Sequence, residues 1–186
     1  LLEIINAVLE LSKIEAGKFI LEDADVDIGR LLQEVLHLIE VEGQRKGLAL
    51  STFGEISFGA LRGDPTRLRQ ALLNYANNAV KFTEHGSVTL GVKILDEDPA
   101  GILLRFEVRD TGIGIDEVTL HRLFNAFEQA DNSSTRHYGG TGLGLAITRR
   151  TGFRAIERIS SSQSLRYGSV VATTISCALT WTGRMP

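Results

Sequence analysis

The sequence predicts an α/β (α+β) two-layer sandwich, in which helices cover one face of a mixed sheet. Segments with helical periodicity and segments with strand periodicity both occur, and they do not alternate strictly along the chain. The 186 residues, 43% hydrophobic and 23% charged, suit one globular domain or one domain with a short appendage. A net charge of −3 provides no basic footprint for nucleic acid.

The composition also favours a soluble, cytoplasmic domain. A single cysteine, Cys177, cannot form an internal disulfide, and this favours a reducing compartment. Scattered histidines and one cysteine argue against a structural zinc site. No apolar run approaches the roughly 20 residues that a membrane span needs, and the first residues lack the layout of a signal peptide.

Residues 1–15 are predicted to be helical, with Gly17 as the stop signal. The apolar stripe consists of Leu1, Ile4, Val8 and Leu11. Two interpretations stay open. The helix packs on its own domain, or it is the end of a longer bundle helix, as an apolar start without a cap suggests.

A second helix is predicted from the N-cap Asp27 to near Gly47, although Gly43 weakens it by roughly 1 kcal/mol relative to Ala. Its apolar side consists of Ile28, Leu31, Leu32, Val35 and Ile39. His37 on this helix is expected to be a solvent-facing or boundary residue. A strand is predicted at residues 48–53.

A third helix begins at Asp64-Pro65, a capping residue followed by proline at the first helical position, and runs to about Phe82. Strands are predicted at residues 87–95, 102–109 and 169–179, with an acidic turn at 96–99 between the first two. A short helical piece is predicted at 120–127, and a further helix near Gly142.

Three constellations carry possible chemistry. On the third helix, Asn74, Asn78 and Lys81 share one face. An amide oxygen is a hard, neutral ligand suited to Mg²⁺, and a lysine one turn further meets phosphate as a point charge. Helical asparagines are usually only polar surface, so this pattern is weak by itself.

The second constellation is Asp110-x-Gly112-x-Gly114, which follows a predicted strand. A carboxylate at a strand end accepts a hydrogen bond from an exocyclic amine such as that of adenine, and glycines let the backbone approach a flat ring. Many β-turns have the same composition.

The third constellation is the glycine-rich run 139–145, which leads into a helix. Exposed amides and a helix N-terminus bind phosphate. The run lacks the lysine of a P-loop, and no clear strand leads into it as a dinucleotide fingerprint requires. Arg136 adds charge just upstream, although a lone arginine there is more often solvated.

Together these residues resemble the GHKL superfamily, and within it the catalytic domains of sensor histidine kinases. LNYANNAVKFT at 73–83 resembles their N box, and DTGIGI at 110–115 their G1 box. LFNAFEQAD at 123–131 is similar to the F box, and GTGLGL at 140–145 to the G2 box. LSKIEAG at 11–17 resembles the junction that closes the second dimerisation helix.

The resemblance implies a Bergerat-type ATP site with 128–141 as the ATP lid. It implies that Asn78 holds Mg²⁺, that Asp110 recognises the adenine amine, and that Asn74 and Lys81 take part in catalysis and nucleotide binding. The other implied nucleotide-binding residues are Gly112, Gly114, Ile115, Phe127, Arg136, Gly140, Thr141, Gly142, Leu143, Gly144 and Leu145.

Transfer of the ATP γ-phosphoryl group to a histidine is the reaction that the resemblance implies. ATP-hydrolysing branches of the superfamily carry a glutamate at the position of Asn74, and an amide cannot act as that general base. Residues 1–17 would be the end of a dimerisation helix, and 18–186 the catalytic domain. The implied partners are a histidine-bearing dimerisation domain and a response regulator, with a homodimer in the full-length protein.

Two features depart from the family pattern. No phospho-accepting histidine motif surrounds any of the four histidines, which are His37, His85, His121 and His137. Residues 151–167 lack the expected Gly-Gly turn, as in a diverged or frame-altered segment. A nucleotide-binding regulatory or pseudo-kinase module therefore remains the alternative, and a purely structural helical interaction domain is the third hypothesis.

Overall fold

The computed structural model describes residues 22–54, 61–98, 101–114 and 144–145, the backbone of 171–181, and single residues within the first twenty. The chain forms two compact units. One consists of Leu21–Gly114 with Arg154–Pro186, and the other of Leu1–Ile20 with Ile115–Phe153. All the strands and both long helices described below belong to the first unit, which therefore carries the sheet.

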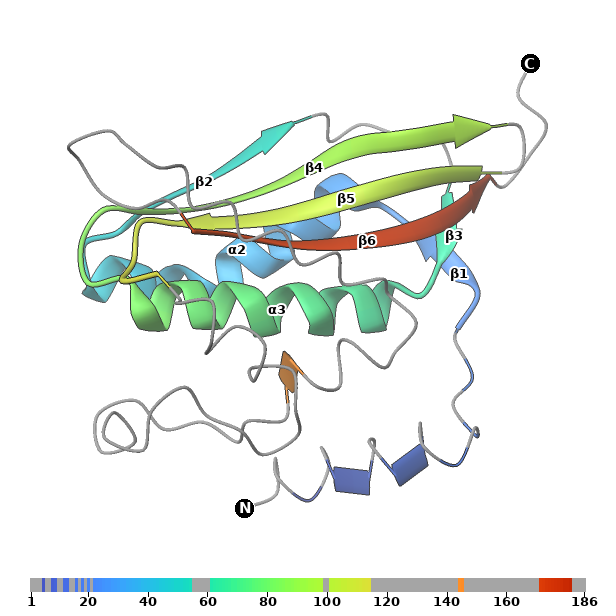
Figure 1. Cartoon of the computed structure of the whole chain (residues 1–186), viewed down its shortest axis with the longest axis horizontal. Helices are drawn as coiled ribbons and strands as arrows, with labels where there is room; N and C mark the ends of the chain where they lie inside the picture. Colours follow the sequence, from blue (N-terminus) through green and yellow to red (C-terminus); the bar gives the residue numbers. More distant parts are fainter. Residues whose placement is uncertain are drawn as a thin grey trace. The chain divides into compact units, whose positions relative to one another are not determined.

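A six-stranded sheet in the order β1-β3-β6-β5-β4-β2 forms one layer of this unit (Figure 1). The strands are β1 (Ala24–Val26), β2 (Ala49–Gly54), β3 (Leu61–Gly63), β4 (Ser87–Asp98), β5 (Gly101–Asp110) and β6 (Val171–Trp181). Strands β2 and β4 pair in parallel, and the remaining pairs are antiparallel. The predicted mixed sheet is confirmed, and the strand predicted at 169–179 is β6, between β3 and β5.

Two strands, β1 and β3, were not predicted from the sequence. Each has three residues, which is too short for an alternating pattern to be recognised. They exist because tertiary pairing supplies their hydrogen bonds: β1 pairs with β3, and β3 pairs with β6.

Helices α2 (Ile28–Arg45) and α3 (Pro65–Phe82) lie together on one face of the sheet (Figure 1). Both predicted N-caps are confirmed, because the side chain of Asp27 accepts from the Arg30 amide and that of Asp64 from the Arg67 amide. The largest fully buried side chains are Phe106, Leu32, Ile39, Leu61, Leu68, Leu72, Leu90, Leu104, Val35 and Val80. Among the described helices, none combines the length and apolarity that crossing a membrane requires.

Gly43 has a packing role that explains its presence inside α2. A Cβ atom at this position would lie 2.8 Å from Leu50 Cδ1 on β2. The glycine therefore lets the helix approach the sheet closely, at the expense of intrinsic helix propensity.

The predicted acidic turn at 96–99 is wrong for its first three residues. Asp96, Glu97 and Asp98 continue β4 and pair with β5 after a register shift between Ile94 and Asp96. Their side chains are exposed, so their charges stay solvated while the long partner strand supplies backbone hydrogen bonds. The low strand propensity of acidic residues is thus overridden by pairing.

Several predicted elements lie outside the described residues. These are the helical piece at 120–127, the polar lid at 128–141 and most of the helix near Gly142, of which Gly144 and Leu145 are described and helical. Of the predicted first helix, the described residues with helical backbone are Ile5, Val8, Leu9, Ser12 and Lys13.

Candidate functional site

Three of the predicted site residues lie along α3 at the boundary between core and solvent. Asn74, Asn78 and Lys81 are all half-buried, whereas Asn77 between them is exposed. The buried side of the same helical stretch consists of Tyr75, Ala76, Ala79 and Val80. The spacing of four and then three residues places the three polar side chains in one row, as predicted.

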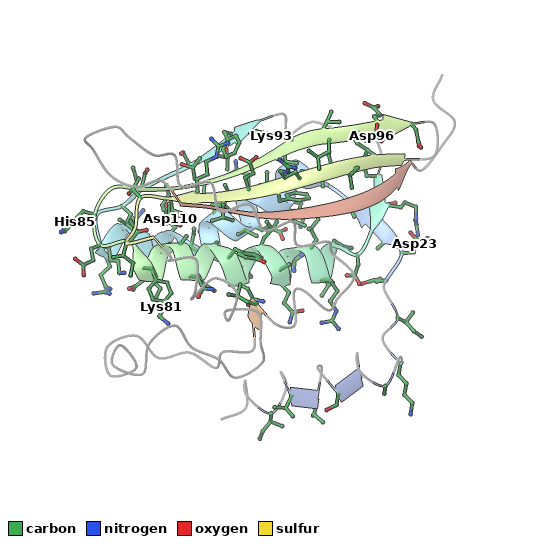
Figure 2. The ribbon with its side chains drawn as sticks, viewed as in Figure 1. Asp23, Lys81, His85, Lys93, Asp96 and Asp110 are labelled. Atoms are coloured by element: carbon green, nitrogen blue, oxygen red, sulfur yellow. The ribbon has the colours of Figure 1, made fainter. Side chains whose placement is uncertain are left out.

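Lys81 closes this row at the C-terminal end of α3. Its Nζ lies 4.7 Å from the centre of the Phe82 ring. Burial lowers the pKa of the Lys81 ammonium from its ordinary value. Figure 2 shows Lys81, His85 and Asp110 at the same end of the helix and sheet, with Asp23 at the other end.

Asp110 is the last residue of β5 and ends a row of side chains that face the helices. The row consists of Ile102, Leu104, Phe106, Val108 and Asp110. Asp110 is only 9% exposed, and burial raises the pKa of its carboxyl, while the hydrogen bond from the Gly112 amide opposes that rise. The Gly112 amide donates to Asp110 Oδ1 at 2.9 Å.

The loop after Asp110 rests directly on the end of α3. The amide of Ile113 donates to the Phe82 carbonyl at 3.3 Å. A Cβ atom on Gly112 would lie 2.5 Å from that carbonyl oxygen and 2.8 Å from Asp110 Oδ1. Gly114 has φ 75, a left-handed conformation that favours glycine. Both predicted glycines are therefore required by the geometry, one for close approach and one for its backbone angle.

Thr111 fastens the same loop to the turn that follows α3. Its hydroxyl accepts from the Ser87 amide at 3.0 Å and donates to the His85 carbonyl at 3.2 Å. Gly86 lies against it with φ 112, and a Cβ there would come 2.1 Å from the hydroxyl oxygen. Thr111 lies within the G1 box and Thr83 within the N box, but neither residue was assigned a role from the sequence.

The remaining predicted site residues fall into two groups. Gly144 and Leu145 are helical and half-buried, and they belong to the other compact unit. Those outside the described residues are Ile115, Phe127, Arg136, Gly140, Thr141, Gly142 and Leu143. Of the described histidines, His37 is exposed and contacts Glu40, and His85 lies exposed in the turn after α3.

The described arrangement has a clear chemical capacity. Asp110 is a desolvated carboxylate acceptor, and the loop that follows it packs closely on the end of α3 because Gly112 has no side chain. At the adjoining helix end, Asn78 supplies amide oxygen and Lys81 a cation. An amine-bearing ring and an anionic group with a hard divalent cation are the ligands that such a donor set suits.

The amino-acid sequence of this chain is similar to those of several known proteins. Residues 63–177 match the family described as histidine kinase-, DNA gyrase B-, and HSP90-like ATPase. Hybrid signal transduction histidine kinase B of Dictyostelium discoideum is 36% identical over 180 residues, which are 96% of this chain and 9% of that protein. Sensor protein GacS of Pseudomonas syringae pv. syringae is 45% identical over 151 residues, 81% of this chain and 17% of that protein.

The solved structure of full-length ShkA in complex with AMPPNP matches with a TM-score of 0.76 and 31% identity. The match covers 98% of this chain and 36% of that chain. The present chain thus spans less than a fifth of the two curated relatives named above. The family model covers more than half of this chain, and the relatives are sensor histidine kinases. The chain belongs to the histidine kinase-, DNA gyrase B- and HSP90-like ATPase family, as an ATPase domain of the sensor histidine kinase type.

Proposed function

We propose that this chain binds Mg-ATP and transfers its γ-phosphoryl group to a histidine on a dimerisation domain. The observation that carries the proposal is Asp110, a buried carboxylate at the end of β5. The loop that follows it rests on the end of the helix that bears Asn78 and Lys81. Membership of an ATPase family with sensor histidine kinase relatives supports the same conclusion.

Each residue has a defined role in this proposal. Asp110 accepts from the adenine amine, Gly112 and Gly114 let the ring approach, and Lys81 contacts a phosphate oxygen. Asn78 holds Mg²⁺, which supplies neutralisation of phosphate charge. Catalysis of this kind relies mainly on positioning and charge neutralisation, and Asn74 lacks the basicity to activate water.

The remaining residues and partners belong to the same proposal. Ile115, Phe127, Arg136 and the loop 140–145 complete the nucleotide site, with 128–141 as a lid. Residues 1–17 form the end of a dimerisation helix, and 18–186 form the catalytic domain. The acceptor histidine then comes from a dimerisation domain, a response regulator receives the phosphoryl group, and the full-length protein is a cytoplasmic or membrane-anchored homodimer.

Radiolabelled ATP supplied with a separately expressed histidine-bearing dimerisation domain tests this proposal. The expected result is label on that domain, lost when Asn78→Ala removes the amide oxygen. Asn77→Ala is the matched control, because Asn77 is exposed on the same helix turn. Nucleotide binding without label on any acceptor would identify a regulatory module instead. Absence of nucleotide binding by the folded chain would overturn both functions.

A further inference from the structure

The C-terminal end of α3 is held by the side chain of the residue that follows α2. α3 ends at Phe82, and its C-cap Thr83 has an extended backbone (φ −102, ψ 118). The last carbonyls of a helix lack intrahelical donors, and a left-handed glycine cap commonly satisfies them. Thr83 provides no such cap, so these carbonyls need donors from elsewhere in the fold.

Lys46, which follows α2, supplies most of those donors. Its Nζ donates to the carbonyl of Val80 at 2.7 Å, to that of Lys81 at 2.8 Å and to that of Thr83 at 3.3 Å. A cation at this position also complements the negative end of the α3 dipole. One ammonium group thus binds three backbone carbonyls, 34 to 37 residues away in sequence.

The one carbonyl of residues 80–83 that Lys46 does not bind is hydrogen-bonded to the candidate site. The Phe82 carbonyl lies between those of Lys81 and Thr83, and it accepts from the Ile113 amide. The backbone of residues 80–83 is therefore bound on one side by Lys46 and on the other by the loop that follows Asp110. A shift of this backbone would move the Lys81 side chain and the support of Gly112 together.

We propose that Lys46 is a positioning residue for the nucleotide site, acting through the end of α3 without contacting the ligand. The inference rests on the proposed function, because it assumes that Lys81 and Asp110 bind opposite parts of one nucleotide. Lys46 fixes the helix end on which both depend. A displacement of about 1 Å at such a site costs up to roughly 100-fold in activity.

The test compares Lys46→Met with Lys46→Arg in the 186-residue chain. Lys46→Met keeps the aliphatic stem and removes the ammonium, whereas Lys46→Arg keeps a cation with several donors. We expect the dissociation constant for Mg-ADP to rise about tenfold in Lys46→Met. An effect of this size is typical of substitutions that change a site without contacting its ligand. We expect Lys46→Arg to recover at least part of that loss.

Lys93→Met is the matched control for general loss of stability. Lys93 also makes a charged contact, 3.0 Å to Glu107, and it is not part of the proposed site. Thermal melts measure the loss of stability in each variant. We expect unchanged nucleotide affinity in Lys93→Met, even where its melting temperature falls as far as that of Lys46→Met.

Hydrogen exchange in the nucleotide-free chain supplies a second readout, independent of binding. We expect the amides of Gly112 and Ile113 to exchange faster in Lys46→Met, while amides in the centre of β4 and β5 keep their protection. Uniformly faster exchange would show a merely structural role and overturn the inference, as would wild-type affinity in Lys46→Met.

Two remaining outcomes are also informative. If Lys46→Met does not fold, Lys46→Gln replaces it in the test. Because glutamine keeps a neutral donor, we expect a smaller rise in the dissociation constant and a smaller increase in exchange at Gly112 and Ile113. If the wild-type chain binds no nucleotide, the proposed function fails, and the nucleotide role of Lys46 is overturned with it. Exchange at Gly112 and Ile113 still decides whether Lys46 holds the loop, so the two failures are distinguishable.

Discussion

Two carboxylates three positions apart on β5, Glu107 and Asp110, are both almost inaccessible to solvent, at 5% and 9% exposure. They face opposite sides of the sheet, because side chains alternate along a strand. Glu107 lies 3.0 Å from Lys93 Nζ, and it also accepts from the Arg109 guanidinium. Among the described residues no lysine or arginine pairs with Asp110, which accepts from the neutral amide of Gly112.

Their pKa values shift in opposite directions as a result. Burial raises the pKa of both carboxyls, but hydrogen bonds from Lys93 and Arg109 outweigh it at Glu107 and bring that pKa below its ordinary value. At Asp110 burial dominates, and the pKa is raised. A buried carboxylate that contacts two cations, as Glu107 does, has its charge balanced within the fold. One with only neutral donors keeps capacity for a ligand, and this difference supports the proposed role of Asp110 in nucleotide binding.

The largest expected effect is the loss of nucleotide binding on substitution of Asp110, which Glu107 should not share. Asp110→Asn should weaken Mg-ADP binding by at least about 100-fold, because an amide presents a donor where the site requires an acceptor for the adenine amine. The variant should stay folded, since the exchange also removes a buried charge. Calorimetric titration with a parallel thermal melt measures both quantities. Binding at wild-type affinity would show that Asp110, like Glu107, contributes only to the structure.

Gly112→Ala tests whether the loop beside Asp110 must approach α3 this closely. We expect a loss of about 2 kcal/mol in the free energy of unfolding, because the new Cβ would overlap the Phe82 carbonyl. Nucleotide affinity should fall as well. Denaturant unfolding and titration are the measurements.

The matched control for that substitution is Gly47→Ala. Gly47 has φ 68, yet nothing lies within 4 Å of its Cβ position. Backbone strain alone should cost about 1 kcal/mol there, and nucleotide affinity should not change. Equal losses of affinity in the two variants would contradict a specific role for the close approach.

Glu107→Gln should produce the inverse of the Asp110→Asn phenotype. We expect a loss of about 1.5 kcal/mol in unfolding free energy at neutral pH, because the amide lacks the negative charge that Lys93 and Arg109 contact and replaces one acceptor oxygen with a donor. Nucleotide binding should be unaffected. Urea denaturation and titration of the same sample measure the two effects, and reduced binding with intact stability would remove the distinction between the carboxylates.

The smallest effect is the pH dependence of these differences. Since the folded-state pKa of Glu107 is lowered, its contribution is present above its ordinary pKa and is lost as pH falls through the lowered value. The stability gap between wild type and Glu107→Gln should therefore close in acid.

The effect on stability has the opposite sign at Asp110, because its pKa is raised in the folded state. Ionisation of this carboxyl lowers the free energy of unfolding, and protonation removes that loss. Any advantage of Asp110→Asn over wild type should therefore shrink as pH falls below the raised pKa and disappear below the ordinary pKa of the carboxyl. Melting temperatures measured across the acid range test both directions.

Much of the molecule could be predicted from local pattern. The caps Asp27 and Asp64 and the apolar stripes fixed the positions of α2 and α3, because a helix end needs a side-chain acceptor wherever it occurs. Alternation identified the cores of β4 and β5. The ordered motifs around Asn78 and Asp110 indicated the family, which the comparisons then showed.

The tertiary structure decided what depends on partners distant in sequence. Strands β1 and β3 and the acidic end of β4 form because neighbouring strands supply their hydrogen bonds. The opposite pKa shifts of Glu107 and Asp110 follow from which side chains meet each carboxylate. Lys46 was not among the residues singled out from the sequence. Its ammonium reaches the end of α3 only because the packing of α2 beside α3 brings those carbonyls within hydrogen-bond distance.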